Sequence, residues 1–229
     1  MFKITRVSPS IIASNWQDKN EVIKTLKELE RSGAHMVHLD VMDGVFVKNK
    51  TFDYEYIDFI KNNTNLLLDV HLMVANPEKV IDEYIKAGAD ILTVHYEATK
   101  DLQKVLERIK SKGILAGVAI KPKTSTMKLK DILASGLVDV VIVMGVEPGA
   151  CGQTFIPGSA EKVAEVRELD KNVFISIDGG VTLKNAKILK KFGANILVSG
   201  ATIFNSKNMK KTIKALKGRI LFNWNSSEE

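Results

Sequence analysis

Residues 32–44 read SGAHMVHLDVMDG, and this stretch decides the fold. A glycine ends a helical segment, a mostly apolar strand follows, and an Asp-Gly turn closes it. Glycine is favoured just past the C-terminus of a helix, and a largely apolar run is typical of a strand buried on both faces. The same order of helix, glycine and strand recurs at 87–95, 112–120, 135–144 and 192–200. A recurring helix–strand unit predicts strands that pair in parallel.

Three more apolar segments, at 7–13, 66–73 and 173–180, bring the expected strands to eight. The segments between them are amphipathic and are expected to be helical: 18–32, 54–62, 77–87, 100–112, 127–134, 158–168, 183–192 and 207–217. The 229 residues come close to the length of about 250 that is typical of a (β/α)8 barrel. The sequence therefore predicts an α/β fold, a single (β/α)8 TIM-barrel domain over residues 1–229, with 222–229 as a polar C-terminal tail. An open, doubly wound sheet is the alternative.

Composition excludes several classes of protein. The chain is 45% hydrophobic, which suffices for a large core, and its single cysteine, Cys151, rules out an intramolecular disulfide framework. Apolar runs such as 140–144 are too short to span a bilayer, and the first 15 residues lack the apolar core of a signal peptide. The net charge of +6 comes from scattered lysines without an aromatic-interleaved stripe, which argues against nucleic-acid binding. We expect a cytoplasmic protein. A mildly positive surface would favour an anionic small substrate, but for the charge alone a solvated lysine-rich surface is the stronger interpretation.

Polar side chains fall at the ends of three expected strands. His38 and Asp40 are two residues apart and therefore point to the same side of one strand, while His71 and Asp178 close two others. Barrel enzymes place their chemistry at these strand ends. Two imidazoles and two carboxylates suit one divalent metal ion, Zn²⁺ most naturally, with Fe²⁺, Mn²⁺ and Co²⁺ as alternatives.

Each polar residue alone also has a simpler interpretation. A single histidine such as His71 on an apolar strand is more often a hydrogen-bonded core residue, and Asp43-Gly44 is typical of a turn. We expect His95 and Glu97 to support the site rather than to bind a ligand, and His35 to be exposed. The metal hypothesis therefore depends on the convergence of four residues.

Glycine-rich segments follow three strands and predict contacts to a phosphate group. DGG at 178–180 and SGA at 199–201 lie after the seventh and eighth strands, where barrels often bind phosphate through backbone amides. EPGACGQTF at 147–155 follows the sixth strand and is expected to form a lid. Met42, Met73 and Met144 also fall near strand ends, where they either fill the core or form an apolar collar that keeps water from the metal.

Several motifs together carry a family resemblance: SPSIIAS, HLDVMDG, LDVHLMV, AGADILTVHYEA, VMGVEPGACGQTFIP, IDGGV and VSGATIF. In order and spacing they resemble the ribulose-phosphate 3-epimerase family, from about Ser8 to Leu216. The resemblance implies a barrel isomerase, commonly a homo-oligomer, that interconverts D-ribulose 5-phosphate and D-xylulose 5-phosphate in the pentose phosphate pathway.

The resemblance also implies roles for individual residues. His38, Asp40, His71 and Asp178 would bind the metal; Asp40 and Asp178 would be the acid–base pair; and Ser10, His71 and Asp178 would contact substrate. The backbone would hold the phosphate at Gly149, Ala150, Cys151, Gly152, Gly179, Gly180, Gly200 and Ala201. Inverting a carbon beside a ketone removes a proton from one face and returns one to the other through an enediolate, which requires two such groups.

The loops depart from the family pattern, whereas the four ligand positions do not. After the second strand the chain has Val45, Lys48, Lys50 and Asp53 in place of a histidine, a proline, a leucine and a glycine. In the lid, Gly145, Ala150 and Cys151 replace a hydroxyl residue, an aromatic residue and a glycine, and Gly200-Ala201 replaces a Gly-Ser turn.

Three alternatives stay open. One is a 3-epimerase of another ketose phosphate such as D-allulose 6-phosphate. Another is a catalytically degenerate barrel that only binds a sugar phosphate. The third, a decarboxylase or synthase of the orotidine-decarboxylase type, is disfavoured because HLDVMDG lacks the lysine of its Asp-x-Lys-x-x-Asp motif.

Overall fold

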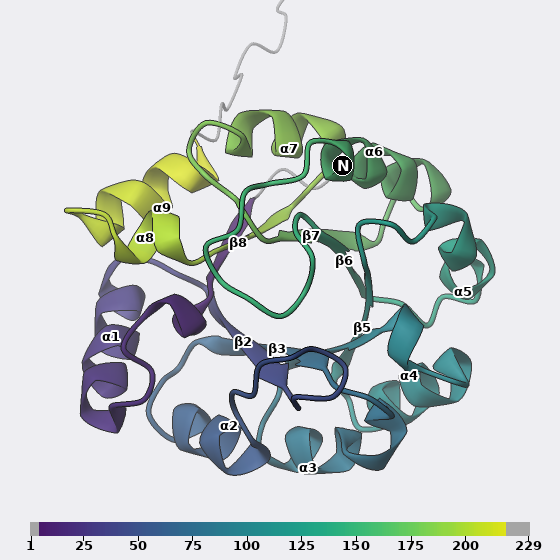
Figure 1. Cartoon of the computed structure of the whole chain (residues 1–229), viewed down its shortest axis with the longest axis horizontal. Coiled ribbons are helices and arrows are strands. Elements are labelled where there is room, and N and C mark those ends of the chain that lie inside the picture. The colour runs from purple at the N-terminus through teal and green to yellow at the C-terminus, as the bar shows by residue number, and fades with distance from the viewer. Residues whose placement is uncertain (1–4, 219–229) are drawn as a thin grey trace, which may run out of the picture.

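The computed structural model describes residues 5–218, which form a barrel of parallel strands surrounded by helices (Figure 1). The strands are β1 (Arg6–Pro9), β2 (Met36–Met42), β3 (Leu67–Met73), β4 (Ile91–His95), β5 (Leu115–Ile120), β6 (Val140–Met144), β7 (Phe174–Asp178) and β8 (Ile196–Ser199). Their order in the 8-stranded sheet is β1-β8-β7-β6-β5-β4-β3-β2, and a parallel bridge from Ser10 to His38 brings its two edges together. The barrel is therefore nearly closed, and the doubly wound alternative is wrong.

A helix follows each strand and covers the outside of the barrel (Figure 1). The α-helices are α1 (Lys19–Arg31), α2 (Tyr54–Lys61), α3 (Ile81–Lys86), α4 (Leu102–Lys110), α5 (Lys130–Ala134), α6 (Gly158–Leu169), α7 (Ala186–Phe192), α8 (Ala201–Phe204) and α9 (Met209–Lys217). Within residues 5–218, no helix combines the length and the apolar character needed to cross a membrane.

Several expected elements are shorter in the structure than in the sequence analysis. The helix expected at 127–134 begins as a 3-10 helix at Thr126–Leu129, and α5 follows it. The first strand was expected over 7–13, but β1 ends at Pro9 and a 3-10 helix occupies Ile11–Ala13. Pairing continues through Ser10, whose N–H donates to the Ser199 oxygen, and the chain then turns into the 3-10 helix. The helix expected at 77–87 is a 3-10 turn at Pro77–Lys79 followed by α3. The expected polar tail at 222–229 lies outside the described residues.

The glycine that precedes each repeated strand ends a helix, as expected. All five of these glycines have φ values between 71° and 115°, which residues with a Cβ rarely adopt: Gly33, Gly88, Gly113, Gly136 and Gly193. A polar residue directly before the strand adds a contact that the sequence analysis did not identify. Asp90, Asp139 and Asn195 each accept a backbone N–H from the preceding strand. The repeat thus specifies both the helix end and the alignment of neighbouring strands.

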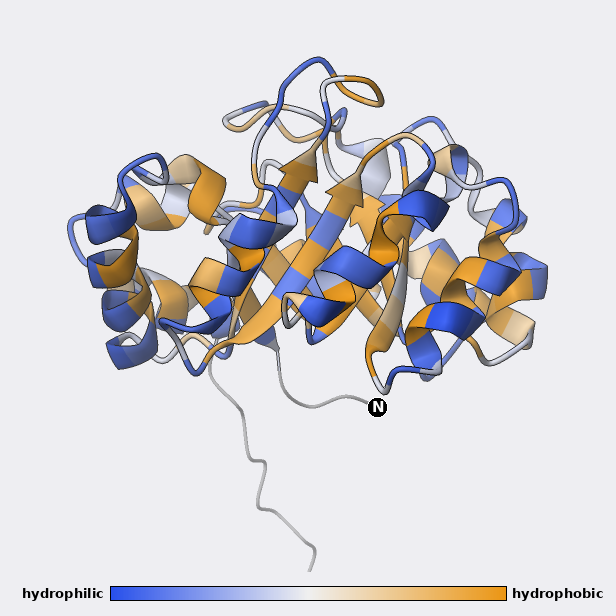
Figure 2. Ribbon diagram, turned by 90° about the horizontal axis from the view of Figure 1, so that it is seen from below, coloured by the Kyte–Doolittle hydropathy of each residue, from blue (hydrophilic) through white to orange (hydrophobic). Residues whose placement is uncertain are grey.

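The barrel interior has an apolar lower part and a polar upper part. Met36, Ile91, Val140 and Ile196 are the first residues of their strands, and they pack in one apolar cluster with Ala119, Ile142 and Met144. Because side chains alternate along a strand, His38 and Asp40 point inward on the same side as Met36. The strands all point to the side from which the long loops project (Figure 2). The polar side chains thus lie at the end where loops can cover a substrate.

Candidate active site

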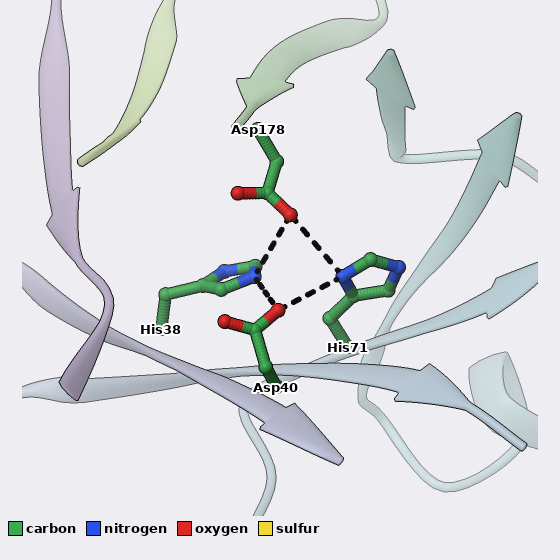
Figure 3. Close-up of side chains that lie close together, drawn as sticks. All are labelled: His38, Asp40, His71 and Asp178. Carbon is green, nitrogen blue, oxygen red and sulfur yellow. Dashed lines mark ion pairs between the residues drawn. The ribbon is translucent and has the colours of Figure 1, made fainter. Parts of the chain in front are cut away.

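Four side chains meet at the carboxyl ends of β2, β3 and β7 (Figure 3). His38 Nε2 lies 3.2 Å from Asp40 Oδ1 and 3.7 Å from Asp178 Oδ2. His71 Nδ1 lies 3.4 Å and 3.5 Å from the same two oxygens. One potential ligand atom from each residue lies within 4.8 Å of the other three. The four residues that the sequence analysis grouped are therefore brought together in space.

The chemistry of this cluster fits a divalent metal ion. His38 Nε2 and His71 Nδ1 are buried and complete no hydrogen bond within the described residues, although both point at the carboxylates. A buried nitrogen without a partner is costly, and a cation would satisfy both nitrogens at once. Two imidazole nitrogens and two carboxylate oxygens are a donor set that zinc and related transition metals accept.

The electrostatics of the cluster also favour a cation. Burial opposes ionisation of both carboxyls, yet His38 and His71 hold the pKa of Asp40 and that of Asp178 below the usual range. Burial likewise disfavours charged imidazoles, but the carboxylates outweigh it and raise the pKa of His38 and His71 above the ordinary value. The negative charge of the two carboxylates keeps protons on the imidazoles. The same charge would favour a divalent cation, which would replace those protons when it binds.

A strand neighbour fixes the orientation of His38. Its Nδ1 lies 2.8 Å from Asp69 Oδ2 on β3, and the Ser8 hydroxyl donates to the same oxygen over 2.9 Å. Nδ1 therefore carries the proton, and Nε2 is directed at the centre of the cluster. The sequence analysis assigned Asp69 no role, although its spacing from His71 was a usable signal because both lie on the same side of β3.

His71 is held from a different direction. Its Nε2 lies 3.0 Å from His95 Nε2, and His95 Nδ1 lies 3.1 Å from Glu97 Oε2. Burial lowers the pKa of His95 to about 4, so this imidazole is neutral at physiological pH. His95 thus contacts a candidate ligand and Glu97 contacts His95, and both lie outside the four-residue cluster.

Ser10 stabilises the carboxylate of Asp40 from the cavity side. Its hydroxyl donates to Asp40 Oδ2 over 2.6 Å, which leaves Oδ1 directed at the imidazoles. The Thr51 hydroxyl bonds the backbone oxygen of Asp40 and ties the following loop to β2. The residue that the family resemblance assigned to substrate contact therefore also orients a candidate proton carrier.

A cavity of about 530 Å³ opens above the cluster. Asp40 and Asp178 reach it, whereas His38 and His71 are fully buried beneath it. Its walls contain every residue expected to hold phosphate or form the collar: Gly149, Ala150, Cys151, Gly152, Gly179, Gly180, Gly200, Ala201, Met42, Met73 and Met144. Lys184 also lines the cavity, and it is the only lysine or arginine among the described residues that does so. The sequence analysis did not single out Lys184.

The segment between β6 and α6 crosses the mouth of the barrel (Figure 1). The amide of Gln153 donates to the backbone oxygens of Glu147 and Ala150, which closes the segment on itself. The amide of Asn49, from the β2–α2 loop, donates to the Gly149 oxygen over 2.6 Å. We call residues 145–157 the lid, and it is joined to a second loop on the opposite side of the cavity.

Gly145 sits where the lid leaves β6, and the space around it is filled. A Cβ at this position would lie 2.3 Å from the Gly179 backbone oxygen and 2.8 Å from the Phe155 ring. Its N–H donates to the Asp178 backbone oxygen. The replacement of the family's hydroxyl residue by glycine is therefore accompanied by a close packing of the lid against the β7 end.

Two residues outside the cluster behave as the sequence analysis expected. The Asp43 carboxylate accepts the N–H groups of Val45 and Phe46, which is a turn contact, and it also accepts from Ala75. His35 is exposed. Neither residue contributes to the candidate metal site.

Comparisons with known proteins support one family. A model of the ribulose-phosphate 3 epimerase family matches residues 6–204. The chloroplastic ribulose-5-phosphate-3-epimerase of Arabidopsis thaliana is 40% identical over 92% of this chain and 75% of its own length. The ribulose-phosphate 3-epimerase of Bacillus subtilis is 36% identical over 93% of this chain and 98% of its own.

Solved structures of lower identity share the fold. The 3-keto-L-gulonate-6-phosphate decarboxylase of Vibrio cholerae has a TM-score of 0.71 at 11% identity, over 95% of this chain and 96% of that one. A 3-hexulose-6-phosphate synthase has a TM-score of 0.66 at 17% identity, over 93% and 98%. At such identities the likeness concerns the barrel alone. The family match and the relatives at 36–40% identity show more: this chain belongs to the ribulose-phosphate 3-epimerase family, a family of isomerases.

Proposed function

We propose that this chain is a metal-dependent 3-epimerase that interconverts D-ribulose 5-phosphate and D-xylulose 5-phosphate. The observation that carries the proposal is the pair of buried carboxylates, Asp40 on β2 and Asp178 on β7, which face each other beneath one cavity (Figure 3). Family membership supports the same reaction, because the relatives carry the name of this epimerase.

The two carboxylates suit an inversion at C3. One removes the C3 proton from one face of the sugar, and the other returns a proton to the opposite face. In the reverse direction the two exchange roles. The hydrogen bond from Ser10 holds Asp40 in place while its protonation state changes. A single carboxylate could exchange the proton with solvent but could not invert the carbon.

A divalent ion held by His38, Asp40, His71 and Asp178 would stabilise the negative charge that develops on the sugar oxygens beside C3. The chain supplies the surroundings for this step. Met42 and Met73 pack with Val47 beside the cluster, and Met144 lines the same cavity. These apolar side chains keep water away from the carboxylates and strengthen the electrostatic interactions between them and the substrate.

The far end of the cavity suits the phosphate group. Gly179, Gly180 and Gly200 line the cavity without a side chain, and a Cβ at each position would meet neighbouring atoms closer than 3 Å. Bare backbone N–H groups bind phosphate oxygens in many barrels. Lys184 would add the one positive charge of the cavity wall.

A 3-epimerase of a six-carbon ketose phosphate such as D-allulose 6-phosphate is the second candidate. Three of the residues that depart from the family pattern line the cavity: Ala150 and Cys151 in the lid and Ala201 in the phosphate turn. None of them belongs to the carboxylate pair, so they bear on the choice of sugar rather than on the reaction.

The test is an assay of purified, metal-loaded protein on both sugar phosphates in heavy water. We expect epimerised ribulose 5-phosphate with solvent deuterium at C3, about one divalent ion per chain by elemental analysis, and loss of activity with a chelator that Zn²⁺, Co²⁺ or Mn²⁺ restores. His71→Ala should lose the ion, whereas His35→Ala, at an exposed histidine, should keep it.

Three outcomes would contradict parts of the proposal. Preferred turnover of the allulose ester would select the second candidate. Full activity after exhaustive chelation would remove the metal from the reaction. Binding of both esters without turnover would identify a sugar-phosphate-binding barrel. A cytoplasmic location and a homo-oligomeric state remain predictions.

A further inference from the structure

We infer that His95 and Glu97 are positioning residues that make His71 a metal ligand through its Nδ1 atom. They do so by fixing which nitrogen of each imidazole carries the proton. The inference rests on the proposed function in one respect, since a metal must bind at the four-residue cluster. It assigns a task to two side chains that take no part in proton transfer: His95, which is fully buried, and Glu97, whose side chain is 20% exposed.

The direction of each hydrogen bond follows from Glu97. Its Oε1 accepts the backbone N–H of Lys121 over 2.8 Å and the hydroxyl of Thr124. Its Oε2 faces His95 Nδ1 at 3.1 Å, and a carboxylate that is ionised can only accept. His95 Nδ1 must therefore carry a proton.

The next link follows from the first. His71 Nε2 lies 3.0 Å from His95 Nε2, so one of the two nitrogens donates and the other presents a lone pair. A metal bound at His71 Nδ1 requires the proton of His71 on Nε2, and His95 Nε2 is then the acceptor. The proton of neutral His71 is thereby placed on Nε2, and its Nδ1 lone pair points at Asp40 and Asp178 (Figure 3). Without Glu97 and His95 the other tautomer, with its proton on Nδ1, would repel a cation.

Packing fixes the ring planes as well. His71 and His95 are fully buried, and their rings stack with centroids 4.9 Å apart and planes 29° apart. Phe46 covers the other side of His95 with its centroid at 4.8 Å, and the Lys121 ammonium lies 4.0 Å from the Phe46 centroid. Because neither imidazole is exposed, solvent water does not compete for the hydrogen bond between them.

Helix α6, outside the barrel, stabilises the segment that holds Glu97. The turn at 121–124 supplies both donors to Glu97 Oε1. The ammonium of Lys162, on α6, donates to the backbone oxygens of Lys121 at 3.1 Å, of Pro122 at 2.7 Å, and of Thr124. A continuous path of hydrogen bonds thus links the helix that follows the lid to a candidate metal ligand.

The experiment measures metal affinity by chelator competition and records the visible spectrum of the Co²⁺-loaded protein. Glu97→Ala and His95→Ala should each weaken Co²⁺ and Zn²⁺ binding by roughly 10- to 100-fold, the usual effect of removing a residue that orients a ligand histidine. Both should also change the Co²⁺ spectrum. At saturating metal, kcat should recover more fully than the affinity for the metal does.

Two further variants separate positioning from simple loss of packing. His95→Gln keeps an acceptor near the same place and should restore much of the affinity. Thr126→Val removes another buried hydrogen bond nearby, the one from its hydroxyl to Glu165, and should leave the metal affinity and the Co²⁺ spectrum unchanged.

The outcomes distinguish the two proposals. If the wild-type chain binds no metal, the proposed metal-dependent function fails, and this inference fails with it. If the wild type binds metal but both alanine variants retain its affinity and spectrum, this inference alone is overturned. Loss of affinity in Thr126→Val equal to that in Glu97→Ala would also overturn it.

Discussion

The floor and the cover of the cavity are built in opposite ways. The floor consists of side chains on β2, β3 and β7, all buried, and each imidazole is oriented by a hydrogen-bonded partner on an adjacent strand or at the end of one. The cover consists of the 43–50 loop and the lid, where Val45 is 78% exposed and Ala150 and Cys151 are exposed. Departures from the family pattern gather in the cover. The register of the strands fixes the positions of the four clustered side chains. The loops can vary in sequence without moving these side chains, and they can change which molecule enters the cavity.

The largest effect should follow from a change in the floor. Asp40→Asn and Asp178→Asn each remove a proton carrier and a ligand charge, so each should lower kcat by roughly 10³-fold or more at saturating metal. Asp139→Asn, at a carboxylate that accepts the Ala116 N–H at the opposite end of the barrel, should leave kcat nearly unchanged. Steady-state assays decide, and equal losses in all three variants would mean that kcat reports folding rather than proton transfer.

A glycine at the boundary between floor and cover provides the next test. Gly145→Ala should lower the free energy of unfolding by about 1–3 kcal/mol, because its Cβ would press on the Gly179 backbone oxygen and the Phe155 ring. Gly158→Ala is the matched control, since nothing lies within 4 Å of its Cβ. Denaturant titration measures both variants. If Gly145→Ala is as stable as the control, the lid is not packed tightly against β7.

A change confined to the cover should have a moderate effect. A lid without its usual aromatic residue should leave the cavity wetter, so we expect ribulose 5-phosphate turnover roughly 10-fold below that of ordinary family members, or about 1.4 kcal/mol of barrier. Ala150→Phe combined with Cys151→Gly should recover part of this difference. Ala215→Phe adds an aromatic residue at an exposed position of α9 and controls for bulk alone. Ordinary turnover by the unmodified chain, or a loss in the double variant, would contradict this role of the lid.

The smallest effect should come from Lys184, the exposed lysine of the cavity wall. Lys184→Gln should raise KM about two- to fivefold with little change in kcat, because an exposed ion pair contributes about 0.2–1 kcal/mol. The effect should shrink as ionic strength rises. Lys187→Gln, on α7 and outside the cavity wall, is the control. Identical KM values for the two variants would show that Lys184 does not contribute to phosphate binding, which would then depend on the backbone N–H groups alone.

Much of this architecture was accessible from the sequence because it depends on short-range patterns. The five glycines that end helices mark the repeat, and alternation along each strand places His38 and Asp40 on one side. The closed arrangement of strands then brings Asp178 to the same end of the barrel. The spacing of residues in the sequence does not predict this position, but the count of eight helix–strand units does, because eight units close into a barrel.

What the sequence did not reveal depends on contacts between distant segments. Asp69 Oδ2 accepts hydrogen bonds from Ser8 and His38, which lie on other strands, and this shared contact appears only when β1, β2 and β3 are placed. The packing of Gly145 against Gly179 and Phe155 joins three segments in the same way. Lys184 escaped notice because lysine is common at the surface, and only the cavity distinguishes it from its neighbours.

The full burial of His38 and His71 has a kinetic consequence. Neither imidazole has any exposed surface, and the aspartates that reach the cavity are only 6% and 7% exposed. Under the proposed function, an ion would therefore enter and leave through the cavity that the sugar phosphate occupies. The ion would have to bind before the sugar phosphate, and a bound sugar phosphate would block its release. The rate at which a chelator strips the protein should accordingly fall as sugar phosphate is added, even where the equilibrium affinity for the ion is unchanged.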